Sequence, residues 1–141
     1  MKIELIENPS EAEVAVIYEG LRAFNIPHFP GLIEQSFGLF IRNHKGQIIG
    51  GSIGVILLSV MQIKYLWLAE KVRGQGMGTK LIQLLENEAR VRGLQSIALE
   101  TYTFQAPAFY ARLGFNEVGK YVNYPCKGID KIFYQKVLCN E

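Results

Sequence analysis

The first part of the chain predicts a short strand followed by a helix. Lys2–Glu7 alternates polar and apolar positions, which is typical of a β-strand. Ser10 and Glu13 have the spacing of a capping box, and apolar positions at helical spacing continue to about Asn25. Prolines and a glycine between residues 27 and 31 break this helix, and a short second helix is expected over Leu32–Gln35.

The next segment predicts three strands that follow one another in an antiparallel meander. Phe37–Arg42 and Gln47–Leu57 are rich in apolar and β-branched residues. The residues between them, Asn43–Gly46, are typical of a hairpin turn. Met61–Leu68 supplies the third strand.

The rest of the chain alternates helical and strand patterns. Thr79–Arg92 carries apolar residues on one face and charged residues elsewhere, so it predicts an amphipathic helix. The strand, helix and strand from Ile63 to Leu99 predict a right-handed parallel crossover. We expect the remaining elements to be a strand at Ser96–Glu100, a helix at Pro107–Leu113, and strands at Phe115–Tyr121 and Lys131–Val137. Together these elements predict a mixed sheet covered by helices.

Length, charge and apolar stretches narrow the class of protein. The 141 residues predict one domain that spans residues 1–141. A net charge of only +2 argues against a nucleic-acid partner. The longest apolar stretch, Ile53–Met61, is far shorter than the roughly 20 residues of a membrane span. We therefore expect a cytoplasmic protein without a membrane partner, in which Cys126 and Cys139 are reduced thiols and no zinc site is formed.

A glycine-rich segment lies between a predicted strand and a predicted helix. It reads Arg73-Gly74-Gln75-Gly76-Met77-Gly78-Thr79. Glycines let the backbone approach a ligand closely, and the free N–H groups at a helix start favour an anion. The spacing of the glycines does not fit the dinucleotide fingerprint, and Gly78-Thr79-Lys80 does not fit a P-loop. The segment predicts a phosphate or pyrophosphate site of another kind.

This segment resembles the coenzyme A loop of the GNAT superfamily of N-acetyltransferases, Arg/Gln-x-x-Gly-x-Gly/Ala. Arg73, Gly76 and Gly78 occupy its fixed positions. About 25 residues further on, Leu99–Phe115 is similar to the second GNAT signature, in which a strand leads to a helix that ends in Tyr-x-x-x-Gly-Phe. The resemblance covers roughly residues 37–138, and it is closest to small, single-domain bacterial members.

The resemblance implies an α+β fold with a mixed sheet of about seven strands and helices on both faces. In that fold the fourth and fifth strands splay apart, and acetyl-CoA, the only cofactor implied, lies in the gap without a metal. Backbone groups near Leu66 and Leu68 would hold the pantetheine, and the amide near Leu68 would polarise the thioester. The asparagine usual in the family falls at Thr103 here. The implied CoA contacts are Leu66, Trp67, Leu68, Arg73, Gly74, Gln75, Gly76, Met77, Gly78, Thr79, Thr103, Gln105, Phe109 and Tyr110.

Two residues are candidates for proton transfer. Tyr110 matches the position of the tyrosine that serves as general acid in many GNAT enzymes, where it protonates the leaving thiolate. Glu100 ends the strand that lines the gap, and either accepts a proton from the attacking amine or anchors the loop by accepting its backbone amides.

The resemblance implies an N-acetyltransferase that moves an acetyl group from acetyl-CoA to a primary amine by direct attack on the thioester. The alternative is a non-catalytic acyl-CoA-binding regulatory module on the same fold. The acceptor is either a small-molecule amine or an amine of a protein or peptide. A homodimer is also expected, through a strand edge left by the C-terminal strands.

Overall fold

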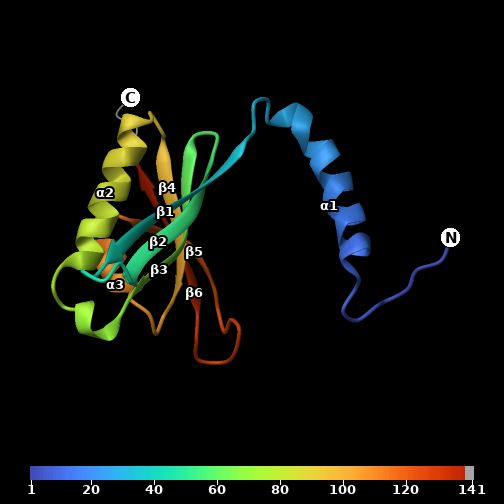
Figure 1. Ribbon diagram of the computed structural model, residues 1–141. Helices are drawn as coiled ribbons and strands as arrows, with labels where there is room; N and C mark the ends of the chain where they lie inside the picture. Colours follow the sequence, from blue (N-terminus) through green and yellow to red (C-terminus); the bar gives the residue numbers. More distant parts are fainter. Residues whose placement is uncertain (139–141) are drawn as a thin grey trace. The chain divides into compact units, whose positions relative to one another are not determined.

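A computed structural model describes residues 1–138, and it divides the chain after Leu32 into two units (Figure 1). Among the described residues, no helix combines the length and apolar character needed to cross a membrane. The elements in chain order are α1 (Glu11–Asn25), the 3-10 helix η1 (Ile26–His28), β1 (Glu34–Arg42), β2 (Ile48–Leu57), β3 (Val60–Leu68), the 3-10 helix η2 (Glu70–Val72), α2 (Met77–Val91), β4 (Ser96–Tyr102), α3 (Pro107–Arg112), β5 (Asn116–Tyr121) and β6 (Lys131–Val137).

The first unit contains α1, which begins with the predicted capping box. The Ser10 hydroxyl accepts the Glu13 N–H at 3.1 Å, and Glu13 Oε1 accepts the Ser10 N–H at 2.9 Å. These bonds from Ser10 lower the pKa of Glu13. Two expectations for this region are wrong: Lys2–Glu7 is not a strand, and β1 begins where a helix over Leu32–Gln35 was expected. Alternation alone does not make a strand, because a strand needs a neighbour to bond with.

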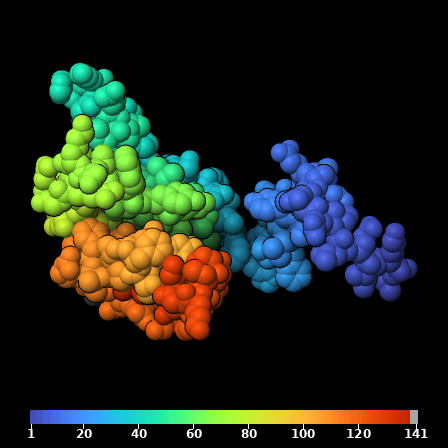
Figure 2. Space-filling view, turned by 90° about the horizontal axis from the view of Figure 1, so that it is seen from below, coloured from blue at the N-terminus to red at the C-terminus, as the bar shows by residue number. Residues whose placement is uncertain are grey.

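The second unit is built on one mixed sheet of six strands in the order β1-β2-β3-β4-β6-β5. The count is one below the expected seven because Lys2–Glu7 does not join the sheet. The β1–β2–β3 meander is antiparallel as predicted. Its first turn is closed by the Asn43 N–H, which donates to Gln47 O at 3.0 Å, and the tip of this hairpin projects from the surface in Figure 2.

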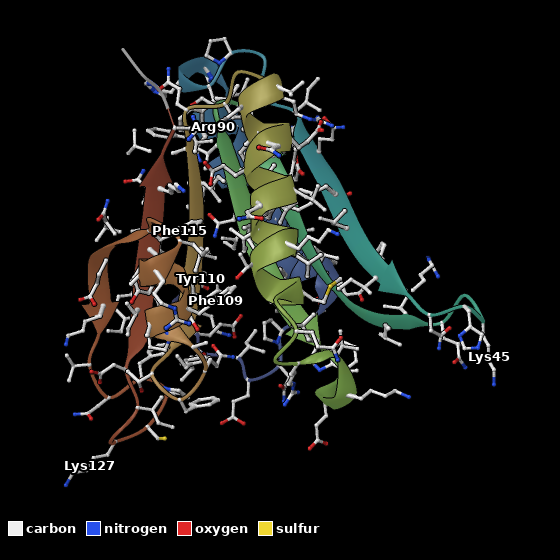
Figure 3. The ribbon with its side chains drawn as sticks, turned by 90° about the vertical axis from the view of Figure 1, so that its left-hand side faces the viewer. Lys45, Arg90, Phe109, Tyr110, Phe115 and Lys127 are labelled. Carbon is white, nitrogen blue, oxygen red and sulfur yellow. The ribbon has the colours of Figure 1, made fainter. Side chains whose placement is uncertain are left out.

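The main core lies on the face of the sheet that α2 and α3 cover. Helix α2 buries the apolar face predicted for it, and its side chains pack against buried residues of the central strands. From α3, the partly buried Phe109 and Tyr110 pack against the same cluster. Figure 3 shows both helices in front of the sheet. The buried residues shared by this core include Leu81, Ile82, Leu85, Ala89, Ile97, Leu99, Ile132 and Tyr134.

A partly buried ion pair joins α2 to β6 and to the end of α3. Lys136 Nζ lies 2.7 Å from Glu86 Oε1 and donates to Leu113 O at 2.8 Å. Both charged side chains are mostly buried, with exposed fractions of 18% for Glu86 and 21% for Lys136. Burial pushes the pKa of Glu86 upward, but hydrogen bonds from Lys136 and Arg90 outweigh this effect and the pKa is lowered.

Lys136→Met is expected to lower the free energy of unfolding by about 1.5–3 kcal/mol at neutral pH, the range for hydrogen bonds to charged groups. Because the folded-state pKa of Glu86 is depressed, its stabilisation is present above the unfolded pKa and is lost as the pH falls through the folded one. The difference from the wild type should therefore shrink in acid. Urea unfolding at neutral pH and at about pH 3 measures both effects.

Arg92→Gln is the matched control, because it breaks an exposed pair between the C-cap of α2 and Glu88 of that helix. Such pairs contribute about 0.5 kcal/mol or less. If Lys136→Met and Arg92→Gln lower the free energy of unfolding equally, the Lys136–Glu86 pair contributes no more to stability than an exposed pair.

Candidate functional site

Strands β3 and β4 are parallel neighbours that stay together over only part of their length. Their register runs from Val60 opposite Ser96 to Ile63 opposite Leu99, and no pairing continues beyond it. The remainder of β3, which includes Leu66 and Leu68, therefore borders a gap. Strands β3 and β4 correspond to the fourth and fifth strands of the expected sheet, whose first strand was Lys2–Glu7. They diverge as expected.

Backbone groups of β3 point into this gap. The Ala69 N–H donates to Ile49 O at the end of the β2–β3 ladder. Because hydrogen-bonding direction alternates along a strand, the backbone groups of Leu66 and Leu68 point away from β2, toward the side of β4. The gap thus offers hydrogen-bonding groups that no strand uses.

The glycine-rich loop joins β3 and η2 to the start of α2. Gly74 and Gly76 have left-handed φ values of +73° and +77°, which glycine adopts without strain. Gly76 is the N-cap of α2, and no side chain caps this end. The first N–H groups of α2 have no acceptor within the helix, and the helix dipole is positive there. A Cβ built at Gly74 or Gly76 meets no atom within 4 Å, so the space above the loop is open to a ligand.

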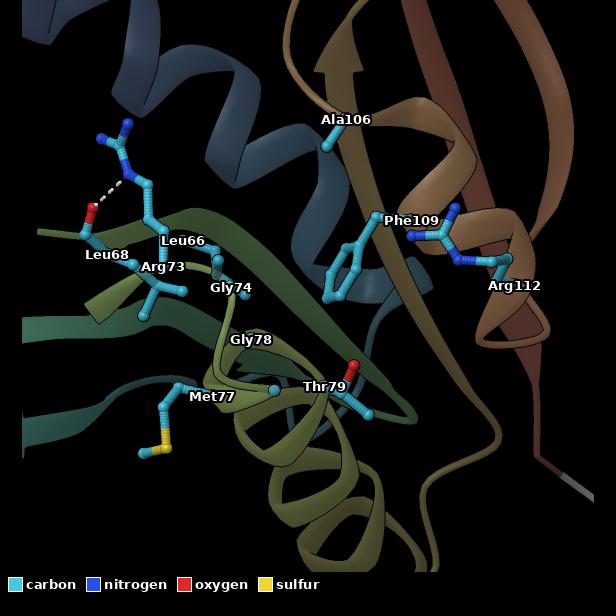
Figure 4. A pocket seen from close by; sticks show the side chains of 11 residues that line it. Leu66, Leu68, Arg73, Gly74, Met77, Gly78, Thr79, Ala106, Phe109 and Arg112 are labelled. Carbon is cyan, nitrogen blue, oxygen red and sulfur yellow. Dashed lines mark hydrogen bonds between the residues drawn. The ribbon is translucent and has the colours of Figure 1, made fainter. Parts of the chain in front are cut away.

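The loop, the gap and α3 together enclose a cavity of about 590 Å³ (Figure 4). Arg73 stands beside the loop, and its Nε donates to Leu68 O at 3.0 Å, which leaves its terminal nitrogens for an anion. The cavity is lined by Leu66, Leu68, Arg73, Gly74, Gly76, Met77, Gly78, Thr79, Ala106, Phe109 and Arg112.

Gly78 allows α2 and α3 to approach each other at this cavity. A Cβ on Gly78 would lie 3.2 Å from Cζ of Phe109 and 3.7 Å from Cδ1 of Leu68. A larger side chain would push against both walls of the cavity. The absence of a side chain at Gly78 therefore sets the width of the site.

Nine of the fourteen residues expected to contact CoA line this cavity: Leu66, Leu68, Arg73, Gly74, Gly76, Met77, Gly78, Thr79 and Phe109. Trp67 does not, because neighbouring side chains of a strand point to opposite faces, and it lines a smaller hollow with Phe40 and Tyr65. Gln75 Nε2 instead donates to Lys71 O at 2.9 Å.

Gln105 and Thr103 are bonded within the protein. Gln105 Oε1 accepts the Tyr102 N–H at 2.8 Å and the Thr101 hydroxyl at 2.9 Å, so it closes the turn between β4 and α3. The Thr103 hydroxyl accepts the Asp130 N–H at 3.2 Å and ties this turn to the β5–β6 loop. Neither side chain lines the cavity, and both instead hold the turn between β4 and α3 in place.

Tyr110 is a residue of α3 and follows Phe109, which lines the cavity; it packs in an aromatic cluster (Figure 3). Its ring is edge-on to Phe109 and Phe115, at centroid distances of 5.1 and 5.9 Å. Burial raises the pKa of Tyr110, so the hydroxyl keeps its proton at neutral pH. No hydrogen bond to this hydroxyl is formed within residues 1–138, and the hydroxyl is not completely buried.

Glu100 lies just beyond the last residue of β4 that pairs with β3, and its carboxylate bonds to a lysine. Lys131 Nζ lies 3.1 Å from Glu100 Oε1, and it also lies 5.1 Å from the ring centre of Tyr124 and 6.0 Å from that of Phe133. The Glu100 side chain is 41% exposed. The hydrogen bond to Glu100 raises the pKa of Lys131. No described hydrogen bond joins Glu100 to the loop amides of the anchor hypothesis.

Ala106 and Arg112 line the cavity but were missed in the sequence. Arg112 follows Phe109 by three residues, a spacing that places both on one side of α3. Arg112 could therefore have been predicted from its helical spacing to Phe109, which was an expected CoA contact. Of the two cysteines, Cys126 is exposed and free, and Cys139 lies outside the described residues.

Residues 6–115 match the family described as Acetyltransferase (GNAT) family. The chain is 33% identical over 110 residues to "Acetyltransferase Atu2258" of Agrobacterium fabrum, with 78% of this chain and 80% of that protein covered. It is 31% identical over 92 residues to blasticidin-S acetyltransferase of Streptomyces morookaense, with 64% and 68% covered.

A solved structure is similar over nearly the whole chain. The crystal structure of an acetyltransferase from Bacillus cereus ATCC 14579 superposes with a TM-score of 0.86 at 30% sequence identity. The superposition covers 96% of this chain and 98% of that one.

Proposed function

The chain belongs to the GNAT family of acetyltransferases, and we propose that it transfers the acetyl group of acetyl-CoA to a primary amine within the gap between β3 and β4. The observation that carries this proposal is the junction of three features in one cavity. These are the backbone at Leu66 and Leu68 that β4 does not pair with, the uncapped start of α2, and the charge of Arg73.

The donor groups of the cavity fit the chemical parts of CoA. The N–H groups from Gly76 to Thr79 suit the pyrophosphate, because they are unpaired and lie at the positive end of the α2 dipole. Arg73 adds a fixed charge for a phosphate oxygen. The backbone of Leu66 and Leu68 offers the pantetheine amides the bonds that β4 does not make.

Acetyl-CoA supplies a thioester whose carbonyl carbon is open to attack by an amine. The Leu68 amide bonds the carbonyl oxygen and stabilises the negative charge that develops there. Tyr110 donates its proton to the sulfur as the carbon–sulfur bond breaks, and it regains a proton from solvent. Glu100 accepts the proton that the amine loses, directly or through a water molecule.

A panel of amines distinguishes this enzyme from an acyl-CoA-binding module. We expect thiol release from acetyl-CoA in the presence of at least one of four classes: amino acids, polyamines, aminoglycosides and peptide N-termini. The release must depend on both acetyl-CoA and the amine. Tight binding of acetyl-CoA without thiol release for any class would favour the binding module instead.

A small molecule is the acceptor class that we favour. Blasticidin-S acetyltransferase, which is 31% identical to this chain, is named for a small molecule. Higher thiol release with peptide N-termini than with any small amine would contradict this choice.

Glu100→Gln is expected to lower kcat/KM about 100-fold or more, the lower range for loss of a general base. The reason is that the amide cannot accept the proton of the amine. We expect the affinity for acetyl-CoA to stay within about twofold, because Glu100 does not line the cavity. Initial rates across pH should show that the acidic limb of the kcat/KM profile moves or disappears.

A different result would assign Glu100 a structural role. If Glu100→Gln weakens CoA binding or lowers stability while the shape of the pH profile stays the same, the residue is an anchor. Lys131→Met serves as the control for stability, since it removes the partner of Glu100 and keeps the carboxylate.

We also propose that the chain forms a homodimer through β5. This strand ends the sheet, and all its residues are exposed, with Val118 at 60% exposure. An unpaired strand edge offers hydrogen bonds to a second copy. Sedimentation equilibrium should give a dimer for the wild type and a monomer for Val118→Lys. A monomer at every concentration of the wild type would contradict the proposal.

A further inference from the structure

Arg112 is the last residue of α3, and it borders two adjoining cavities. It lines the 590 Å³ cavity described above and also a cavity of about 350 Å³ between α2 and α3. In Figure 4 it lies on the α3 side of the site, next to Phe109 and across the cavity from Leu66 and Leu68. Arg112 is therefore part of the lining of both cavities.

The charge of Arg112 is uncompensated within the described part of the chain. Arg90 of α2 and Arg92, the C-cap of that helix, are paired with carboxylates at 2.8 and 2.7 Å. Glu86, the carboxylate that shares the second cavity with Arg112, already bonds Lys136 and Arg90. No acceptor in residues 1–138 bonds the Arg112 guanidinium. A guanidinium is always charged and offers paired donors, so it suits a phosphate group.

We propose that Arg112 binds the ribose 3′-phosphate of CoA and makes the enzyme select CoA over its 3′-dephosphorylated form. This inference rests on the proposed function. With the thioester beside β3 and the pyrophosphate on the loop, the nucleoside end of CoA continues toward the next part of the wall, which is α3. The loop amides and Arg73 serve the pyrophosphate, and Arg112 is the remaining cation of the cavity for the second phosphate group.

Calorimetric titration of CoA and of 3′-dephospho-CoA tests this role. The wild type should bind CoA about tenfold or more tightly than dephospho-CoA, as expected for charge-assisted hydrogen bonds to one phosphate. Arg112→Gln should lose that factor for CoA and keep the wild-type affinity for dephospho-CoA. Arg112→Lys should retain part of the preference, since it keeps the charge without the paired donors.

Arg92→Gln is the matched control, because it removes an arginine at the C-cap of α2 that is outside both cavities and should leave both affinities unchanged. If Arg112→Gln lowers the affinities for CoA and dephospho-CoA by the same factor, the assignment is overturned. Arg112 would then bind the pyrophosphate or stabilise α3. Unchanged CoA binding in Arg112→Gln would also overturn the assignment. Failure of both ligands to bind the wild type would overturn the proposed function, and this assignment with it.

Discussion

Tyr110→Phe is expected to lower kcat about 10²–10⁴-fold, because the leaving thiolate loses its proton donor. The ring should keep its place, since its contacts with Phe109, Phe115 and Tyr134 are made by carbon atoms that phenylalanine retains. Acetyl-CoA binding should therefore be preserved. Steady-state rates with the best amine of the panel, together with calorimetry, measure the two quantities separately.

The pH dependence gives a second readout for Tyr110. Burial raises its pKa above the ordinary value of about 10, and the residue acts in its protonated form. An alkaline limb that arises from Tyr110 should thus lie above about pH 10 and should vanish in Tyr110→Phe.

Tyr134→Phe is the control for this prediction. Tyr134 is a buried tyrosine whose ring centre lies 6.1 Å from that of Tyr110, and burial likewise raises its pKa. Tyr134 has no role in the proposed chemistry. Removing its hydroxyl should therefore leave kcat unchanged within about twofold. Equal losses in both variants, or an unaltered rate in Tyr110→Phe, would remove Tyr110 from the mechanism.

Gly76→Asp is expected to weaken acetyl-CoA binding about 100-fold, or about 2.7 kcal/mol. The new side chain would enter the open space above the loop, where no protein atom lies within 4 Å. There its carboxylate would repel the pyrophosphate and would compete for the amides at the start of α2.

Gly76→Asn separates charge from backbone strain. Both variants must adopt the left-handed φ of +77° at this position, and asparagine has nearly the same shape as aspartate. Calorimetry should show a much smaller loss for Asn than for Asp. If Gly76→Asp binds acetyl-CoA as tightly as the wild type, the pyrophosphate does not lie on this loop.

Local patterns predicted most of the elements correctly. The capping box at Ser10 and the apolar stripe of α2 depend on residues three or four positions apart, so sequence alone contains the signal. The hairpin turn at Asn43–Gly46 is local in the same sense. The glycine-rich loop was predicted from its motif, and Gly74 and Gly76 have the left-handed φ values that glycine adopts without strain.

Errors arose where the outcome depends on distant partners. Lys2–Glu7 alternates like a strand, but no described strand pairs with it. Strand β4 continues past Glu100 to Tyr102 because β6 pairs with it there, with Tyr102 opposite Lys131. The bond between Glu100 and Lys131 likewise joins residues that only the sheet brings together. Such contacts cannot be seen in the periodicity of either segment.

The candidate site shows the same division. Loop residues were predicted from a motif, whereas Arg112 enters the cavity because α3 packs beside α2 at Gly78. Trp67 was included because it lies between Leu66 and Leu68, but alternation along β3 puts it on the opposite face. Assigning residues to the faces of β3 and α3 would have excluded Trp67 from the predicted contacts and included Arg112.

A crystal structure of the protein with CoA tests the central claim most directly. The account predicts pyrophosphate oxygens within hydrogen-bond distance of the amides from Gly76 to Thr79, and pantetheine bonded to the backbone of Leu66 and Leu68 in the gap between β3 and β4. CoA bound elsewhere on the protein, with this gap left empty, would contradict it.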